Sequence, residues 1–301
     1  MSSLDTLIES AGERWTEHAP LGARTTYRVG GRARGLVTLA SDADVDELMP
    51  LVAACGRPWL VIGNGSNLLV ADGDHDLIAV TLTGQLAEST WRDDDGVRVE
   101  VGAGTDLPVL ARRLSADGVT GFEWAVGVPG TVGGAAVMNA GGHGSDMAAS
   151  VRSVTTWSNG WRAWGPDELS FGYRTSALRN VLVTHVSLGL TRGDAETSRE
   201  RLAEIVRWRR EHQPGGANAG SVFRNPPNAS AGALIEAAGC KGLRIGTAEV
   251  STKHANFIIA DPAGRANDVW RVIAEVRARV AAASGVTLQL EHHVVGFEEL
   301  R

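Results

Sequence analysis

The chain has few cysteines and no long apolar run. Among its 301 residues only Cys55 and Cys240 are cysteines, with no CxxC pair and no Cys/His cluster at metal-ligand spacing. We therefore expect neither a disulfide framework nor a metal site, and a reducing cytoplasm is the expected compartment. The longest weakly polar stretch, residues 125–141, is broken by Pro129 and by glycines, whereas a membrane-spanning helix needs roughly 20 mostly apolar residues. Residues 1–15 also lack the features of a signal peptide, so we expect no membrane association.

The chain also has no net positive charge. A formal net charge of −6 and a pI near 5.8 provide no overall attraction for nucleic acid or for an anionic membrane, so no nucleic-acid partner is expected. Hydrophobic residues make up 43% of the chain, which suits one large or two medium globular domains. Glycine is abundant: the 37 glycines are about 12% of the chain, against a typical ~7%, and they gather in a few short stretches. Such stretches suggest ligand-binding loops lined by backbone.

Hydrophobic spacing predicts an alternation of helices and strands. A helix is expected over residues 42–54, with Ser41 as its N-cap and Pro50 as a point where it kinks or is interrupted. Further helices are expected at 106–116, 196–212, 231–238 and 266–283. Strands are expected at 58–62, 77–82, 97–101, 151–157, 161–164, 181–190, 256–260 and 287–295. The pattern predicts an α+β chain with a larger N-terminal and a smaller C-terminal part.

The first glycine loop, residues 63–67, follows an apolar strand. Its small residues would free backbone N–H groups to converge on an anion, and phosphate is the natural candidate. A dinucleotide-binding GxGxxG motif is rejected, because the third glycine is missing and residues 68–73 are typical of a strand and turn. A simple turn between strands remains the alternative.

The second glycine loop, residues 127–135, precedes a short predicted helix and a further glycine-rich stretch at 139–144. Free amides at the start of that helix, together with its dipole, favour a diphosphate. No Gly-Lys-Ser/Thr follows, which excludes a P-loop NTPase. Two such loops outside both common phosphate-binding motifs suggest a different dinucleotide fold, although both could be packing turns.

Several stretches, taken in order, resemble the UDP-N-acetylenolpyruvoylglucosamine reductases, the MurB family. The stretches that carry the resemblance are residues 26–31, 63–68, 127–134, 171–176, 220–226, 235–239 and 253–257. They cover nearly the whole chain, and its compact length is similar to the shorter subtype of that family. The resemblance implies a non-Rossmann, two-lobed FAD-binding domain (PCMH/VAO-type) over residues 1–192, with lobes of about 1–77 and 78–192. It also implies a smaller α/β substrate-binding domain over 193–301.

The resemblance also implies a reaction. In the family, NADPH reduces FAD, and the flavin N5 then delivers hydride to C3 of the enolpyruvyl ether of a UDP-sugar while a protein acid protonates C2. The product is UDP-N-acetylmuramate, a peptidoglycan precursor. A small-molecule UDP-sugar is therefore the expected partner, and the chain is expected to be a monomer.

Site residues carry over from the matching motifs. The expected cofactor contacts are Tyr27, Gly63, Asn64, Gly65, Ser66, Asn67, Gly127, Gly130, Gly133, Gly134 and Asn139. Tyr173 and Asn225 are expected to face the substrate, and Arg174, Ser221 and Glu291 to be catalytic. A guanidinium at Arg174 would stabilise the negative charge that builds on the substrate carboxylate in the transition state. Ser221 would donate the C2 proton, although its hydroxyl could instead bond the local backbone of a turn.

The last predicted strand departs from the family pattern, which reads Leu-Glu-x-Glu-Val followed shortly by Gly. Anchoring on Gly296 makes Glu291 the functional acid, with Gln289 in place of the first Glu and His292 in place of the Val. An alternative register puts His293 at the acid's position. Strand alternation would place Glu291 and His293 on one face, where a protonated imidazole would lower the pKa of the carboxyl.

These departures, and His143 where a Tyr is common in the family, keep two alternatives open. One is a related flavoenzyme that acts on another unsaturated sugar nucleotide in specialised metabolism. The other is a non-catalytic protein that binds FAD or a UDP-sugar.

Overall fold

The computed structural model describes residues 2–298, which divide by their internal contacts into two units. The first unit holds the residues up to Glu17, Gly35–Gly63 and Asp76–Arg209. The second holds His18–Arg34, Asn64–His75 and the residues from Arg210 onward. The domain boundary expected between residues 192 and 193 stays a prediction. Within residues 2–298, each helix is too short or too polar to cross a bilayer.

One sheet of the first unit has the strand order β1-β2-β5-β3. Its strands are β1 (Trp15–Glu17), β2 (Arg32–Leu39), β5 (Asp74–Leu82) and β3 (Trp59–Val61). β1 pairs antiparallel with β2, and β3 runs parallel to β5. Helices α1 (Ser3–Ala11) and α2 (Asp42–Ala54) pack on one another, and their apolar faces join the core of this unit.

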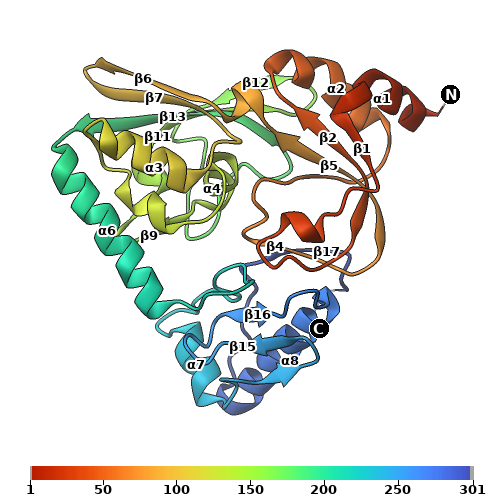
Figure 1. The fold of residues 1–301 in the computed structure, drawn as a ribbon, viewed down its shortest axis with the longest axis vertical. Coiled ribbons are helices and arrows are strands. Elements are labelled where there is room, and N and C mark those ends of the chain that lie inside the picture. The colour runs from red at the N-terminus through yellow and green to blue at the C-terminus, as the bar shows by residue number, and fades with distance from the viewer. Residues whose placement is uncertain (1, 299–301) are drawn as a thin grey trace. The chain divides into compact units, whose positions relative to one another are not determined.

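The larger sheet of the first unit is antiparallel, in the order β12-β11-β13-β7-β6. Its strands are β12 (Trp161–Trp164), β11 (Val151–Trp157), β13 (Leu182–Arg192), β7 (Gly96–Gly102) and β6 (Ser89–Asp94), and β8 (Val119–Thr120) pairs with the end of β13. Helices α3 (Leu107–Ala116) and α4 (Val132–Met138) lie along this sheet, where α4 contacts β13 and β7 (Figure 1). Helix α6 (Ala195–His212) follows β13.

In the second unit a small antiparallel sheet packs against a long helix. The strands are β14 (Arg244–Ile245), β15 (Ala248–Val250) and β16 (Ile258–Ala260), and helix α8 (Ala266–Ser284) contacts all three and the short α7 (Ala231–Ala237) (Figure 1). Tyr27, Val29 and Leu69 join the same hydrophobic core, although they lie far away in the sequence. Strand β4 (Leu68–Val70) pairs in parallel with β17 (His293–Val295).

The five helices predicted from hydrophobic spacing are confirmed, each within one residue of the expected ends. Helix α2 has the predicted bounds, and Ser41 caps it through the Asp44 N–H. The helix is not interrupted at Pro50, because Pro50 and Asp46, whose carbonyl loses its helical donor, both lie on the exposed face. Burial of Val45 and Leu48 holds the turns on either side together.

The predicted strand over residues 287–295 is wrong for most of its length, because this segment changes partner halfway. Residues 289–291 pair with residues 222–224: Arg224 N–H donates to Gln289 O (2.9 Å) and Glu291 N–H to Val222 O (2.8 Å). From His293 onward the chain pairs with β4 instead. Residues 287–295 are therefore not one continuous strand, and the shared face of Glu291 and His293 stays a prediction, while His292 between them is buried.

Candidate active site

The second glycine loop ends at helix α4, and the amides of the helix's first turn are already in use. Gly133 N–H donates to Ala103 O (2.8 Å), and Gly134 N–H donates to the Thr131 hydroxyl (3.4 Å). The expectation of free amides in this turn is therefore wrong for these two glycines. Within residues 2–298, no acceptor faces the N–H groups of Gly130 and Thr131. The amide donors of this loop that have no acceptor among residues 2–298 thus precede the helix.

The two glycine loops meet at Gly63. A Cβ on Gly63 would lie 2.5 Å from Thr131 Oγ1, so only glycine allows this approach. Gly63 is exposed, and its N–H has no acceptor among the described residues. Gly63, Gly130 and Thr131 thus carry backbone donors without protein partners, a donor set that fits an anionic group such as a diphosphate.

Residues 64–67, which continue the first loop, belong to the second unit. Gly65 adopts φ +57°, and a Cβ there would lie 2.6 Å from Thr25 Cα. Its carbonyl accepts from the N–H groups of Thr26 (3.3 Å) and Leu68 (3.4 Å). Asn64 and Ser66 lie on either side of it. The turn is therefore tightly built within its own unit.

Tyr173 and Arg174 form the tip of a tight turn in the first unit. Gly172 and Thr175 close the turn with two backbone hydrogen bonds of 3.0 and 3.2 Å. Arg174 has a left-handed φ of 56°, and its Nη2 donates to Gly141 O (3.2 Å). The guanidinium carbon lies 5.3 Å from the centroid of the Tyr173 ring, which is 57% exposed. The turn thus presents a braced cation beside an exposed aromatic ring.

Asn139 ends helix α4 and supports that turn. Its Nδ2 donates to Gly172 O (3.0 Å) and to the Asp146 carboxylate (3.2 Å), and its Oδ1 accepts from Ala148 N–H (3.0 Å). Only 4% of the residue is exposed. Its amide therefore holds the base of the Arg174 turn, and its contact with a cofactor stays a prediction.

In the second unit, the structure brings Ser221 and Glu291 onto neighbouring backbone segments. Glu291 donates its N–H to the carbonyl of Val222, the residue after Ser221, and its own carbonyl accepts from Asn67 Nδ2 (3.0 Å). Ser221 is half-buried, and within residues 2–298 its hydroxyl makes no hydrogen bond to the local backbone. Ser221 and Glu291, two of the three predicted catalytic residues, thus lie on segments joined by backbone hydrogen bonds.

Sequence reasoning missed Asn256, which fixes the segment after Ser221. Its Oδ1 accepts from Phe223 N–H (3.0 Å), its Nδ2 donates to Phe223 O (2.8 Å), and its carbonyl accepts from Val222 N–H (2.9 Å). The residue lies in the 253–257 stretch that carries part of the resemblance. A polar residue in an otherwise apolar predicted strand was the available signal.

Two predicted ligand contacts have structural roles here. Tyr27 is fully buried, which raises the pKa of its phenol, and its ring packs edge-to-face on His292 at 5.6 Å. Asn225 Oδ1 accepts from Ala231 N–H (2.9 Å) at the start of α7. Contacts of these two residues with a ligand stay predictions.

His143 covers the start of the second glycine loop. A Cβ on Gly127 would lie 3.2 Å from the His143 ring, which packs edge-to-face on Trp208 at 5.1 Å. Burial, and then the nearby charges of Arg209 and Arg201, lower the pKa of His143. The imidazole is therefore mostly neutral at pH 7, and it packs as an aromatic ring between Trp208 and Gly127.

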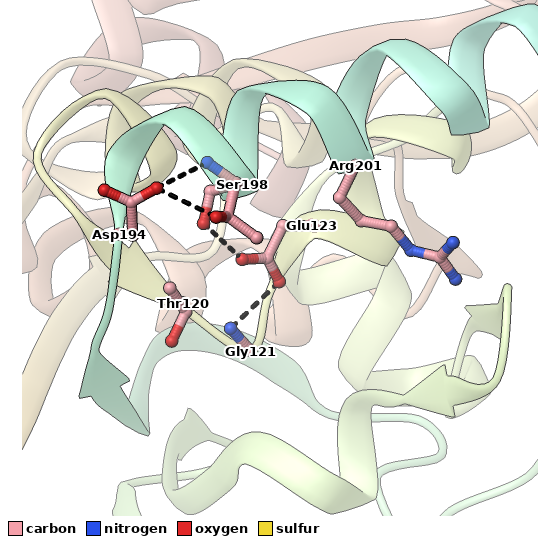
Figure 2. A pocket seen from close by; sticks show the side chains of 7 residues that line it. Thr120, Gly121, Glu123, Asp194, Ser198 and Arg201 are labelled. Atoms are coloured by element: carbon pink, nitrogen blue, oxygen red, sulfur yellow. Dashed lines mark hydrogen bonds between the residues drawn. The ribbon is translucent and has the colours of Figure 1, made fainter.

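A separate pocket of about 340 Å³ lies where α6 begins, and none of the predicted site residues lines it (Figure 2). Its carboxylates are satisfied internally: Glu123 accepts from Gly121 N–H (2.9 Å) and from the Ser198 hydroxyl (2.8 Å), and Asp194 accepts from Thr197 N–H (2.8 Å). Across residues 2–298, no group of three His, Cys, Asp or Glu side chains is placed to hold a metal ion.

Comparison with known proteins identifies the family. Residues 33–159 match the model of an FAD-binding domain, and residues 212–295 match the C-terminal domain of UDP-N-acetylenolpyruvoylglucosamine reductase. The reductase of Heliobacterium modesticaldum is 42% identical over 289 residues, covering 94% of this chain and 91% of the relative. The reductase of a Synechococcus species is 41% identical over 94% of this chain and 93% of the relative.

Solved structures agree. The crystal structure of the reductase from Thermus caldophilus superimposes with a TM-score of 0.79 at 37% identity, covering 92% of this chain and 97% of that one. A glucose dehydrogenase, Phl p 4.0202, matches with a TM-score of 0.51 at 14% identity over 63% of this chain, a likeness that shows the fold alone. The chain therefore belongs to the UDP-N-acetylenolpyruvoylglucosamine reductase family, as an α+β, FAD-dependent oxidoreductase with a PCMH-type FAD-binding domain.

Proposed function

We propose that this chain uses NADPH to reduce the enolpyruvyl group of UDP-N-acetylglucosamine enolpyruvate, which yields UDP-N-acetylmuramate for peptidoglycan synthesis. The observation that carries the proposal is the pairing of residues 222–224 with residues 289–291, which puts Ser221 and Glu291 on adjacent backbone segments. The reductase relatives that match along nearly the whole chain support the same reaction. Cys55 and Cys240 are both free thiols, which supports a reducing cytoplasm as the site of the reaction.

The backbone donors of the first unit, Gly63, Gly130 and Thr131, are the groups we assign to the cofactor's diphosphate. FAD, when bound, supplies the two-electron chemistry that links NADPH to the substrate. We assign further cofactor contacts to the remaining loop residues, namely Asn64, Gly65, Ser66, Asn67, Gly127, Gly133 and Gly134. Tyr27 and Asn139 are both buried. Each would therefore contact the cofactor through its backbone, or after a small shift of its side chain.

Arg174 acts on the substrate carboxylate in this proposal. Reduction of an enol ether that is conjugated to a carboxylate increases the negative charge on that carboxylate, so a fixed cation binds more strongly in the transition state than in the ground state. The closed turn and the hydrogen bond to Gly141 O restrict the guanidinium before substrate binds. Exposed Tyr173, on the same turn, would contact the sugar nucleotide.

Ser221 would donate a proton to C2 of the substrate and recover one from solvent. An alcohol is a weak acid, so it needs a neighbouring group that stabilises the charge left behind. A neutral Glu291 carboxyl would donate a hydrogen bond to the developing enol oxygen, whereas an ionised one would act through a bridging water. Asn225, whose Oδ1 is taken by the start of α7, keeps its Nδ2 for the substrate.

The test separates the two half-reactions by stopped-flow absorbance of the flavin. Ser221→Ala should leave flavin reduction by NADPH near the wild-type rate and slow reoxidation by the enolpyruvyl UDP-sugar by about 10²-fold or more, the usual size of a lost acid catalyst. Ser230→Ala is the matched control, because it removes a hydroxyl that only caps α7. Equal damage to both half-reactions by Ser221→Ala would contradict the role of Ser221, and a wild-type flavin that the substrate cannot reoxidise would contradict the proposed function.

A further inference from the structure

A buried imidazole lies directly after Glu291. His292 is 5% exposed, and its Nε2 lies 3.2 Å from the carbonyl oxygen of Ala219, two residues before Ser221. The other side of the ring packs against Tyr27. The resemblance implies a valine at this position; a valine side chain could fill the space but could not donate a hydrogen bond.

The hydrogen bond fixes the form of the ring. Burial lowers the pKa of His292 to about 4, so the imidazole is neutral near pH 7 and carries one N–H. Because a backbone carbonyl only accepts, that N–H must be on Nε2. In this hydrogen bond, His292 Nε2–H is therefore the donor and Ala219 O the acceptor.

Two hydrogen bonds from consecutive residues bracket Ser221. Glu291 N–H holds the carbonyl of Val222 on one side of it, and the His292 ring holds the carbonyl of Ala219 on the other. Between them lies Gly220, which has φ +80° and no atom within 4 Å of the place where a Cβ would be. Its N–H donates to Asn218 Oδ1 (3.1 Å), but glycine keeps more backbone freedom than other residues, so the hydrogen bonds to Ala219 O and Val222 O help to fix the position of Ser221.

We propose that His292 is a positioning residue that fixes the backbone of Ser221 relative to Glu291 through its hydrogen bond to Ala219. The inference rests on the proposed function, since Ser221 and Glu291 act there as acid and partner. It assigns a role to Nε2 of this buried ring, the nitrogen that bonds to Ala219 O.

The test compares His292→Val, which removes the donor, with His292→Gln, which carries an amide N–H at a similar reach. In FAD-loaded protein, His292→Val should slow flavin reoxidation by the enolpyruvyl UDP-sugar by about 10-fold, because small misplacements of a reacting group have effects of this order or larger. Reduction by NADPH should be unchanged. His292→Gln should recover most of the lost rate.

A second measurement needs no turnover. Amide hydrogen exchange of peptides that cover residues 217–224 should become faster in His292→Val and return toward wild type in His292→Gln. Leu288→Ala is the control, because it removes a buried side chain from the same segment without removing a hydrogen bond; it should lower the unfolding temperature but keep the ratio of the two half-reaction rates.

The two readouts separate the possible failures. Wild-type exchange in His292→Val, or equal impairment of the Val and Gln variants, would overturn the positioning role. If the wild-type flavin is not reoxidised by the enolpyruvyl UDP-sugar, the proposed function fails, and the exchange measurement still decides whether His292 holds the loop.

Discussion

Both backbone polar groups of Glu291 are hydrogen-bonded, so the backbone from which its carboxyl extends is fixed. Its N–H is bonded to Val222 O and its carbonyl to Asn67 Nδ2. Gly296, which anchors the preferred register, is also required by the fold: it has φ +76°, and a Cβ there would lie 2.3 Å from the His75 ring. Both features support Glu291, rather than His293, as the acid beside Ser221.

Glu291→Ala is therefore expected to slow flavin reoxidation by substrate by about 10²-fold while sparing reduction by NADPH. Glu291→Gln keeps a hydrogen-bond donor but cannot transfer a proton, so partial recovery would indicate stabilisation of the enol and no recovery would indicate a proton relay. His293→Ala should have a smaller effect, because His293 is exposed and the register anchored on Gly296 leaves the acid's position to Glu291. Stopped-flow rates for the three variants would contradict the assignment if only His293→Ala were impaired.

At this scale, the sequence predicts residue types better than contacts. The motifs pointed to Ser221 and Glu291, and the structure sets them on adjacent segments. They did not indicate that Asn139 braces the Arg174 turn or that Asn225 bonds to α7. An amide side chain satisfies whichever groups the tertiary fold brings near, and a motif does not contain that information.

Helix α4 contains two adjacent glycines, and the space available for a side chain differs between them. Gly133 is buried, and a Cβ there would lie 2.8 Å from the Ala103 Cβ, so the fold itself requires glycine. Gly134 is exposed, and a Cβ there would meet nothing closer than Thr131 Oγ1 at 3.6 Å. The fold gives little reason for glycine at position 134, so the contact of Gly134 with the cofactor stays a prediction that a substitution can test.

Gly134→Leu should therefore keep the unfolding temperature of the FAD-free protein at or above that of wild type, because leucine favours a helix over glycine by roughly 1 kcal/mol. Its affinity for FAD should fall by about 10-fold, which corresponds to 1.4 kcal/mol. Gly133→Ala is the contrast and should destabilise the FAD-free protein by about 1–3 kcal/mol through overpacking. Calorimetry and flavin titration check both, and wild-type FAD affinity in Gly134→Leu would remove Gly134 from the cofactor site.

Among the elements, those with one continuous partner were predictable and those that change partner were not. Strands β11 and β12 have the predicted bounds: β11 pairs with β13 from Val151 to Trp157, and β12 pairs with β11 along its whole length. Residues 287–295 have the composition of a strand, but they leave residues 222–224 for β4 at His292. Hydrophobic periodicity reports which residues are buried and not which partner they meet.

For the whole molecule, chain order is a poor guide to what packs together. The second unit takes its core from residues beyond 210 and also from Tyr27, Val29 and Leu69. Asp72 accepts from the N–H groups of Ala266 (3.1 Å) and Asn267 (3.2 Å) and so caps α8 from 194 residues away. A boundary drawn from sequence at residue 193 could not include these segments, because nothing local marks them as belonging to the C-terminal part.

This arrangement predicts how an isolated C-terminal fragment behaves. A fragment of residues 193–301 lacks β4, the Asp72 cap and three core side chains, and each large apolar side chain contributes roughly 1.5–3 kcal/mol when buried. Since the net stability of a domain is only about 5–15 kcal/mol, the fragment should show no cooperative urea transition by circular dichroism. Leu69→Ala in the full chain removes only one of these core side chains. It should lower the free energy of unfolding by about 2–5 kcal/mol while the protein stays folded. A fragment that unfolds cooperatively, with a midpoint like that of the full chain, would show that the segments around Tyr27 and Leu69 are dispensable and that residues 193–301 are a domain in their own right.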